Sequence, residues 1–134
     1  MTIMIDNHTL PEKGTITLKI DRTFEVLVTA EQARRKVNRW VQHEVSYLMR
    51  ALSPILMIGD QHIVWQVPIS FGVPHLGQVG TIGTIEVDVY TGRMINKADN
   101  KDVLISQAER LAGQLPPYHP HQEIPKESLA NKTV

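Results

Sequence analysis

Three residues in the middle of the sequence carry side chains that can bind a small ligand or act on one. His62 and His75 flank a predicted strand that contains Trp65. An imidazole titrates near neutral pH, and an indole offers a flat apolar surface with one hydrogen-bond donor. If the three side chains converge in a pocket between a helix and a sheet, the chain is a small-ligand-binding protein or a minor enzyme. The simpler interpretation is that both histidines face solvent.

The other groups with reactive chemistry are interpreted as structural. Glu86 and Asp88 share one face of a strand, where alternate polar residues normally contact water. We expect Asp88 to accept backbone hydrogen bonds across the turn at residues 91–92. The histidine pair at residues 119–121 lies in a Pro-rich segment without the three or four preorganised ligands that a metal site requires. Cysteine is absent and no serine lies in a G-x-S-x-G context, so we predict no catalytic residue, metal site or cofactor.

The most uneven charge in the sequence lies on one side of a predicted helix. The residues there that we single out as candidate partner contacts are Arg34, Arg35, Arg39 and His43. Such a face can bind phosphates or an acidic protein, although surface helices also carry arginine simply as a good helix former. The chain has 14 basic and 14 acidic residues and no aromatic residues interleaved with the basic ones, which argues against nucleic acid. The face is therefore a candidate surface for a protein partner, or it is merely solvated.

A second candidate surface lies in a segment rich in glycine and proline. Residues 71–80 are predicted to form a mobile loop between two antiparallel strands, and such loops often carry binding residues. The central residues of this loop, which we expect to contact a protein partner, are Pro74, His75 and Leu76. The glycines of this region do not connect a strand to a helix, so no phosphate-binding loop is predicted.

The hydrophobic pattern predicts the elements that position these groups. Alternating apolar residues predict strands over 15–20, 24–28, 62–70 and 81–90, a strand or buried connector at 55–58, and a short strand at 93–95. A capping box at Thr29 and Gln32 begins a helix that we place at 29–51, because Pro54 sets its latest end. A second helix is predicted near 101–115, before a pair of prolines. We expect Trp40 and Trp65 to meet where the long helix packs on the sheet.

These elements predict an α+β fold in one domain. We expect an antiparallel sheet of four to five strands packed by one long helix, with a second, shorter C-terminal helix. The domain is placed at residues 15–115, after an N-terminal extension at 1–14. The Pro-rich tail at 116–134 is predicted to be disordered or to drape over a partner.

Composition and targeting signals narrow the class of protein. The N-terminal residues lack the basic and apolar regions of a secretory signal, and no apolar run approaches the ~18 residues of a membrane span. A cytoplasmic location without membrane contact is therefore expected. Free strand edges and a limited core allow a homodimer.

The middle of the chain resembles the PepSY family. The resemblance rests on the helix opening TAEQA at 29–33 and on the strand ending VDVYTG at 87–92, and it covers residues 29–95. It implies a helix packed on a small antiparallel sheet. It also implies a non-catalytic role, because PepSY modules are mostly associated with inhibiting or chaperoning peptidases or with ligand sensing.

The combined interpretation is a non-enzymatic binding or regulatory module that acts through protein–protein contacts. An inhibitor-like or antitoxin-like protein is one concrete form of it. The alternative is the small-ligand-binding protein or minor enzyme described above.

Overall fold

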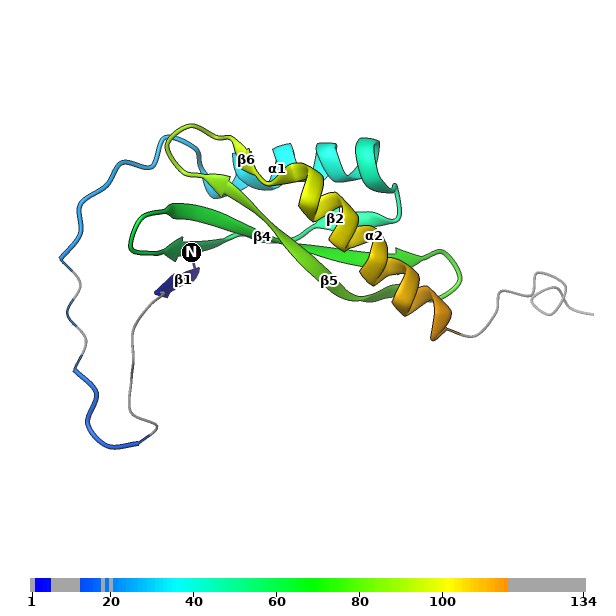
Figure 1. Cartoon of the computed structure of the whole chain (residues 1–134), viewed down its shortest axis with the longest axis horizontal. Coiled ribbons are helices and arrows are strands. Elements are labelled where there is room, and N and C mark those ends of the chain that lie inside the picture. Colours follow the sequence, from blue (N-terminus) through cyan, green and yellow to red (C-terminus); the bar gives the residue numbers. More distant parts are fainter. Residues whose placement is uncertain (1, 6–12, 18, 20, 116–134) are drawn as a thin grey trace, which may run out of the picture.

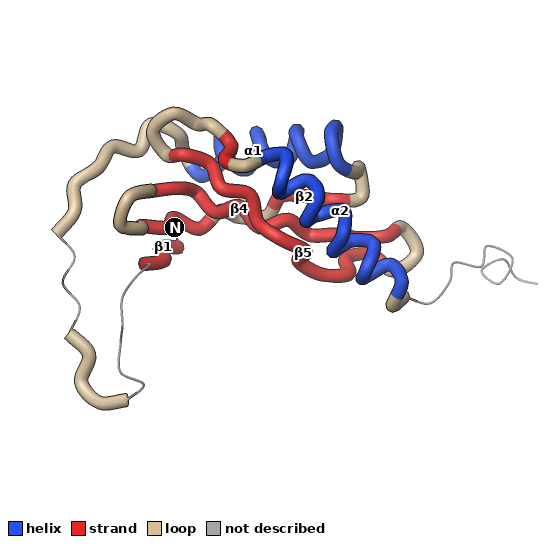
Figure 2. Tube along the Cα trace, viewed as in Figure 1, coloured by secondary structure: helices blue, strands red, loops and turns tan. Residues whose placement is uncertain are grey.

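The fold is α+β, with a mixed sheet and two helices that lie on the same side of it (Figures 1 and 2). The computed structural model describes residues 2–5, 13–17, 19 and 21–115, without the side chain of residue 5. Within these residues the elements are β1 (Thr2–Ile5), α1 (Ala30–Trp40), a π-helical turn η1 (Val41–Val45), β2 (Met49–Ala51), β3 (Ile55–Ile58), β4 (Ile63–Val73), β5 (Gly77–Asp88), β6 (Met94–Ile95) and α2 (Lys97–Gly113). The predicted α+β class is confirmed, but the sheet is mixed rather than antiparallel and has six strands rather than four to five. The C-terminal helix α2, with 17 residues, is longer than α1, with 11, and not shorter as predicted.

Five strands follow each other in the order β1-β3-β4-β5-β6, and β2 pairs with the far half of β4. All neighbours are antiparallel except β1, which runs parallel to β3. β2 and β3 both pair with β4, and residues 52–54 between them belong to neither strand. In this gap the amide of Leu52 donates to the carbonyl of Pro68 at 2.8 Å. Proline has no amide hydrogen to contribute to a ladder. Pro68 therefore lies opposite the gap between β2 and β3, where no regular ladder forms on that side of β4.

The first helix begins as predicted and ends earlier. The hydroxyl of Thr29 accepts from the amide of Gln32, and the Gln32 side chain accepts from the amide of Thr29. The prediction of a helix over 29–51 is wrong beyond residue 45, because Ser46 is extended and Met49–Ala51 forms β2. Met49 and Ala51 are buried against β4 while the residue between them is exposed. This alternation places both apolar side chains in the core, which a continued helix would not do.

A tight hairpin joins β4 to β5, and the prediction of a mobile loop over 71–80 is wrong. β4 continues to Val73 and β5 begins at Gly77, so only three residues connect them. The amide of Leu76 donates to the carbonyl of Val73 at 3.1 Å, and Gly77 has φ +75°. A short turn followed by a left-handed residue is a common connection of antiparallel strands, and glycine adopts that conformation without strain.

The core lies between the sheet and the helices. Trp65 is 2% exposed, and its Nε1–H donates to the carbonyl of Val28 at 2.7 Å. On the neighbouring strand β5, Gly83 lies directly under Leu104 of α2. A Cβ added at Gly83 would be only 2.9 Å from Leu104 Cδ2. Trp40 is half-buried and packs against the edge of the core. Of the two tryptophans that were expected to meet in the core, Trp65 is thus the buried one.

The N-terminal part differs most from the predictions. Thr2–Ile5, which lies in the predicted extension, forms β1. The predicted strands over 15–20 and 24–28 are absent from the described residues there, although the amides of Leu27 and Val28 donate to the carbonyl of Val89. The second helix begins at residue 97, four residues before the predicted start. The Pro-rich tail at 116–134 lies outside the described residues.

Candidate functional site

The turn after β5 is held by the carboxylate of Asp88, as the sequence predicts. Its Oδ1 accepts hydrogen bonds from the amides of Tyr90 and Thr91, each at 2.8 Å, and Gly92 has φ +77°. The backbone hydrogen bond from Thr91, more than any other contact, holds the pKa of Asp88 below its usual range. An anion stabilised in this way is poorly suited to accept a proton in catalysis, so the turn-stabilising role stands.

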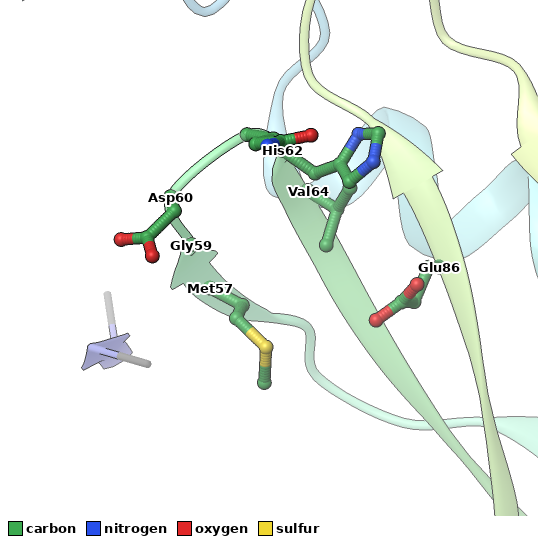
Figure 3. A pocket seen from close by; sticks show the side chains of 7 residues that line it. Met57, Gly59, Asp60, His62, Val64 and Glu86 are labelled. Atoms are coloured by element: carbon green, nitrogen blue, oxygen red, sulfur yellow. The ribbon is translucent and has the colours of Figure 1, made fainter. Parts of the chain in front are cut away.

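A shallow hollow lies on the side of the sheet opposite the helices (Figure 3). It measures about 340 Å³ and is lined by Met57, Gly59, Asp60, Gln61, His62, Val64 and Glu86. Met57, Val64 and Glu86 come from three neighbouring strands and are on the same face. His62 is exposed at its rim, as expected for a solvent-facing histidine.

The three residues of the predicted ligand pocket do not come together. Trp65 faces the helices from the buried side of the sheet, whereas His62 lines the hollow on the other side. His62 precedes β4 and His75 follows it, so the 11 residues of that strand separate them. The predicted pocket between helix and sheet therefore has no structural counterpart among these residues.

No group of three or more histidine, cysteine, aspartate or glutamate side chains in the described part of the chain is arranged to hold a metal ion. The histidine pair at 119–121 lies outside the described residues. Within the described ranges, no helix is long and apolar enough to cross a membrane.

Two of the candidate basic residues are engaged on their own helix. Arg34 and Arg35 contact the carboxylate of Glu31 at 2.6 and 2.9 Å, one turn away. The hydrogen bond from Arg34, followed by that from Arg35, lowers the pKa of Glu31 to about 2. Glu31 thus offsets part of the positive charge at the start of α1, and these two arginines form an ion-paired surface rather than an uncompensated basic patch.

The other two candidate basic residues, Arg39 and His43, line a groove beside Trp40. We call this the Trp40 groove, and it is formed by Lys36, Arg39, Trp40, His43, Glu44 and Met94. It measures about 430 Å³ and is open to solvent. The ammonium group of Lys36 donates to the carbonyl of Gly92, which ties α1 to the turn that follows β5. The groove therefore combines basic side chains with one aromatic surface.

The end of the β4–β5 hairpin carries the candidate residues of the predicted loop. Pro74 and Leu76 are exposed and His75 is half-buried. A small hollow of about 220 Å³ adjoins this turn, and its lining residues are Tyr47, Leu48, Gly72, Val73, Pro74, Gly77 and Gln78. None of these residues is charged. We call the apolar part of this region, formed by Tyr47, Val73, Pro74 and Leu76, the tip surface.

Tyr47 is the residue at this end of the molecule that sequence reasoning missed. The predicted helix over 29–51 includes Tyr47, so the sequence does not indicate that this side chain lies beside the hairpin. In the structure it follows η1 and is 79% exposed. Tyr47 lies beside the hairpin because the helical segment ends at residue 45, and no proline or glycine near residue 46 marks that end in the sequence.

Comparisons with known proteins do not extend these observations, because no family model, curated protein or solved structure matches the chain.

Proposed function

We propose that the chain is a non-enzymatic protein-binding module that contacts its partner through the tip surface. The observation that carries this proposal is the exposure of two large apolar side chains beside an uncharged hollow. Tyr47 is 79% exposed and Leu76 is 47% exposed. Tyrosine is enriched among the residues that dominate binding energy, and charged residues are depleted at the centre of interfaces.

The hairpin presents Leu76 on a backbone with little freedom. The three connecting residues are fixed by the hydrogen bond from Leu76 to Val73 and by the ring of Pro74. Each flexible side chain that is ordered on binding costs about 0.5–1.5 kcal/mol, and loop ordering adds to this cost. A surface that is already ordered avoids part of it, so the tight turn favours binding more than the predicted mobile loop would.

The basic residues of α1 are assigned a smaller part. Arg34 and Arg35 are ion-paired with Glu31, so an acidic partner would have to compete with that carboxylate. Arg39 lines the Trp40 groove and can add attraction for acidic groups near the contact. The resemblance to PepSY modules supports a binding role without catalysis, since the same order of a capped helix and antiparallel strands occurs here.

Affinity capture with the full chain tests this proposal. The tagged protein is incubated with native lysate, and captured proteins are compared between wild type, Tyr47→Ala and Leu76→Asp. Tyr90→Ala is the matched control, because Tyr90 is also a large exposed aromatic residue at 58% exposure but lies outside the tip surface. We expect a partner that is retained by wild type and by the control and lost from both tip variants.

A charge-reversal variant separates the tip surface from the basic helix. Arg35→Glu combined with Arg39→Glu is expected to retain the same partner with at most a few-fold weaker binding at low salt. If this variant loses the partner while Tyr47→Ala keeps it, the contact lies on α1 and the tip proposal is wrong. All variants must show wild-type far-UV circular dichroism before capture is compared.

A further inference from the structure

Residues 13–28, which we call the arm, contain a segment with the sequence of a strand, and the described residues of that segment join no sheet. Residues 15–20 alternate between polar and apolar side chains, the pattern of a strand with one buried face. In the structure Ile16 is 48% exposed, and the described residues of the arm form no strand. Figure 1 shows residues 13–17 well away from the sheet. The apolar side chains of such a strand, and its backbone hydrogen-bonding groups, are stabilised when it pairs with a sheet.

The outer edge of β1 is an apolar strand edge that can pair with such a segment. β1 is the first strand in the sheet order, and among the described residues no strand pairs with its outer side. Its sequence is TIMI, without a charge, a proline or a bulge to protect it. Ile3 is 55% exposed and Met4 is 43% exposed. Natural sheets normally protect their edges, and an apolar unprotected edge readily accepts another strand.

The opposite edge of the sheet, formed by β5 and β6, is less suited to accept a strand. The short strand β6 covers only Glu86 and Val87 of β5, and the pairing of β5 with β4 shifts register at Ile69/Ser70 and at Phe71/Gly72. Such bulges twist an edge and prevent regular pairing. The β1 edge is therefore the place where an added strand fits.

We propose that residues 15–20 of one copy add as a strand to the β1 edge of a second copy of this chain. Two copies related by a two-fold axis exchange their arms, so both edges are covered and the assembly closes as a dimer. The exchange also covers Ile3 and Met4 of each copy and gives the apolar side of each arm a neighbour. The proposal goes beyond the protein-binding function, since it uses a different surface.

Geometry argues against an antiparallel return of the arm along β1 of its own chain. β1 runs parallel to β3, so its last residue lies near Gly59, which follows β3. The guanidinium of Arg22 donates to the carbonyl of Gly59 at 2.9 Å and holds the arm at that end of β1. An antiparallel return of residues 15–20 along β1 of the same chain would carry residue 20 toward the other end, at Thr2. In the structure residues 13–17 instead lie away from β1 of their own chain, which leaves them accessible to a second copy (Figure 1).

The mass of the full chain in solution gives the first test. Sedimentation equilibrium is expected to yield a dimer of twice the 15.1 kDa chain mass. Ile16→Lys should shift the protein to monomer, whereas Val103→Lys should not. Val103 is a matched control because it is a β-branched residue with similar exposure, 51% against 48%, on α2. A wild-type monomer at every concentration up to the millimolar range would overturn the proposal and leave the edge to a different protein.

Site-specific crosslinking shows which strands meet. Because the chain contains no cysteine, only the introduced thiols can react. Ile3→Cys and Thr17→Cys are prepared as separate proteins, mixed, and treated with a short bismaleimide. We expect a crosslinked dimer from the mixture and none from either variant alone. Crosslinking of Ile3→Cys with itself would place two β1 edges against each other and overturn the proposal. So would a monomeric crosslinked species from the chain that carries both substitutions.

The two proposals fail separately. Tyr47→Ala leaves the arm and β1 intact, so it should remain dimeric even when it no longer binds a partner. Ile16→Lys should become monomeric and still bind through the tip surface.

Discussion

Replacement of Asp88 tests how much one carboxylate contributes to the turn that closes the β5–β6 hairpin. Its Oδ1 receives both the Tyr90 and the Thr91 amide, while the backbone bond from the Gly92 amide to the Asp88 carbonyl does not involve the side chain. Asp88→Ala removes both side-chain bonds and the charge. Asp88→Asn keeps an acceptor oxygen and removes only the charge.

The magnitude follows from the two hydrogen bonds and their exposure. A hydrogen bond to a charged group contributes about 1.5–3 kcal/mol when it is shielded from water. Asp88 is half-buried and both bonds lie at the surface, which places each near or below the lower end of that range. We expect Asp88→Ala to lower the free energy of unfolding by about 2 kcal/mol. Asp88→Asn should lower it by about 1 kcal/mol.

The loss should depend on pH in one direction. The pKa of Asp88 is lower in the folded protein than in the unfolded chain, so the folded state favours the ionised form. The stability that this carboxylate contributes is complete above its unfolded pKa, near 3.9, and is lost as pH falls through the folded pKa. The difference between wild type and Asp88→Asn should therefore be largest at pH 7 and shrink progressively below about pH 5.

Urea unfolding followed by circular dichroism at several pH values measures this difference. Protein concentration is held constant, because association would change the apparent stability. Glu31, whose pKa is also lowered, is present in both proteins and cancels from the comparison. A difference between wild type and Asp88→Asn that stays the same from pH 7 to pH 3 would show that the charge is not what stabilises the turn.

Three further substitutions test the packing and the caps. Gly83→Ala should cost about 1–2 kcal/mol, because its Cβ would lie 2.9 Å from Leu104 Cδ2; urea unfolding of the same change in a Leu104→Ala background should show little cost. Thr29→Ala should cost about 1 kcal/mol by urea unfolding, since the capping box is lost, and Thr29→Ser should restore most of it. Trp65→Phe should lower the thermal midpoint and cost about 2 kcal/mol, because the Val28 carbonyl loses its buried donor; an unchanged midpoint would contradict the role of that bond.

The features that the sequence predicts correctly are set by neighbouring residues. The capping box needs only Thr29 and Gln32, three residues apart. The carboxylate of Asp88 needs only the amides two and three residues later. In both cases the donor and the acceptor are fixed by a short stretch of backbone, so residue type and spacing are sufficient.

The features that it misses depend on partners far along the chain. The spacing of Val45, Leu48 and Leu52 fits a helix, but pairing of Met49–Ala51 with β4 requires a strand. β1 finds its partner more than 50 residues later, and nothing local marks a four-residue strand near the N-terminus. The tip surface was predicted only in part for the same reason, since Tyr47 reaches it through the early end of a helix.

The positions of the two proposed surfaces have a consequence for binding strength. β1 lies beside β3, which pairs with the first residues of β4, while the tip surface lies beyond its last residue. An 11-residue strand spans roughly 36 Å, so arm exchange at one end leaves the tip surface at the other end uncovered.

An exchanged dimer therefore presents two tip surfaces, and linked sites bind a multivalent target more tightly than either site alone. Once a partner is identified, surface plasmon resonance with that partner immobilised at high density should show slower dissociation for wild type than for Ile16→Lys, by roughly 10²-fold or more. At low partner density, where only one site can engage, the two proteins should dissociate at the same rate. Equal rates at high density, with wild type confirmed as a dimer, would show that the two tip surfaces cannot reach one target together.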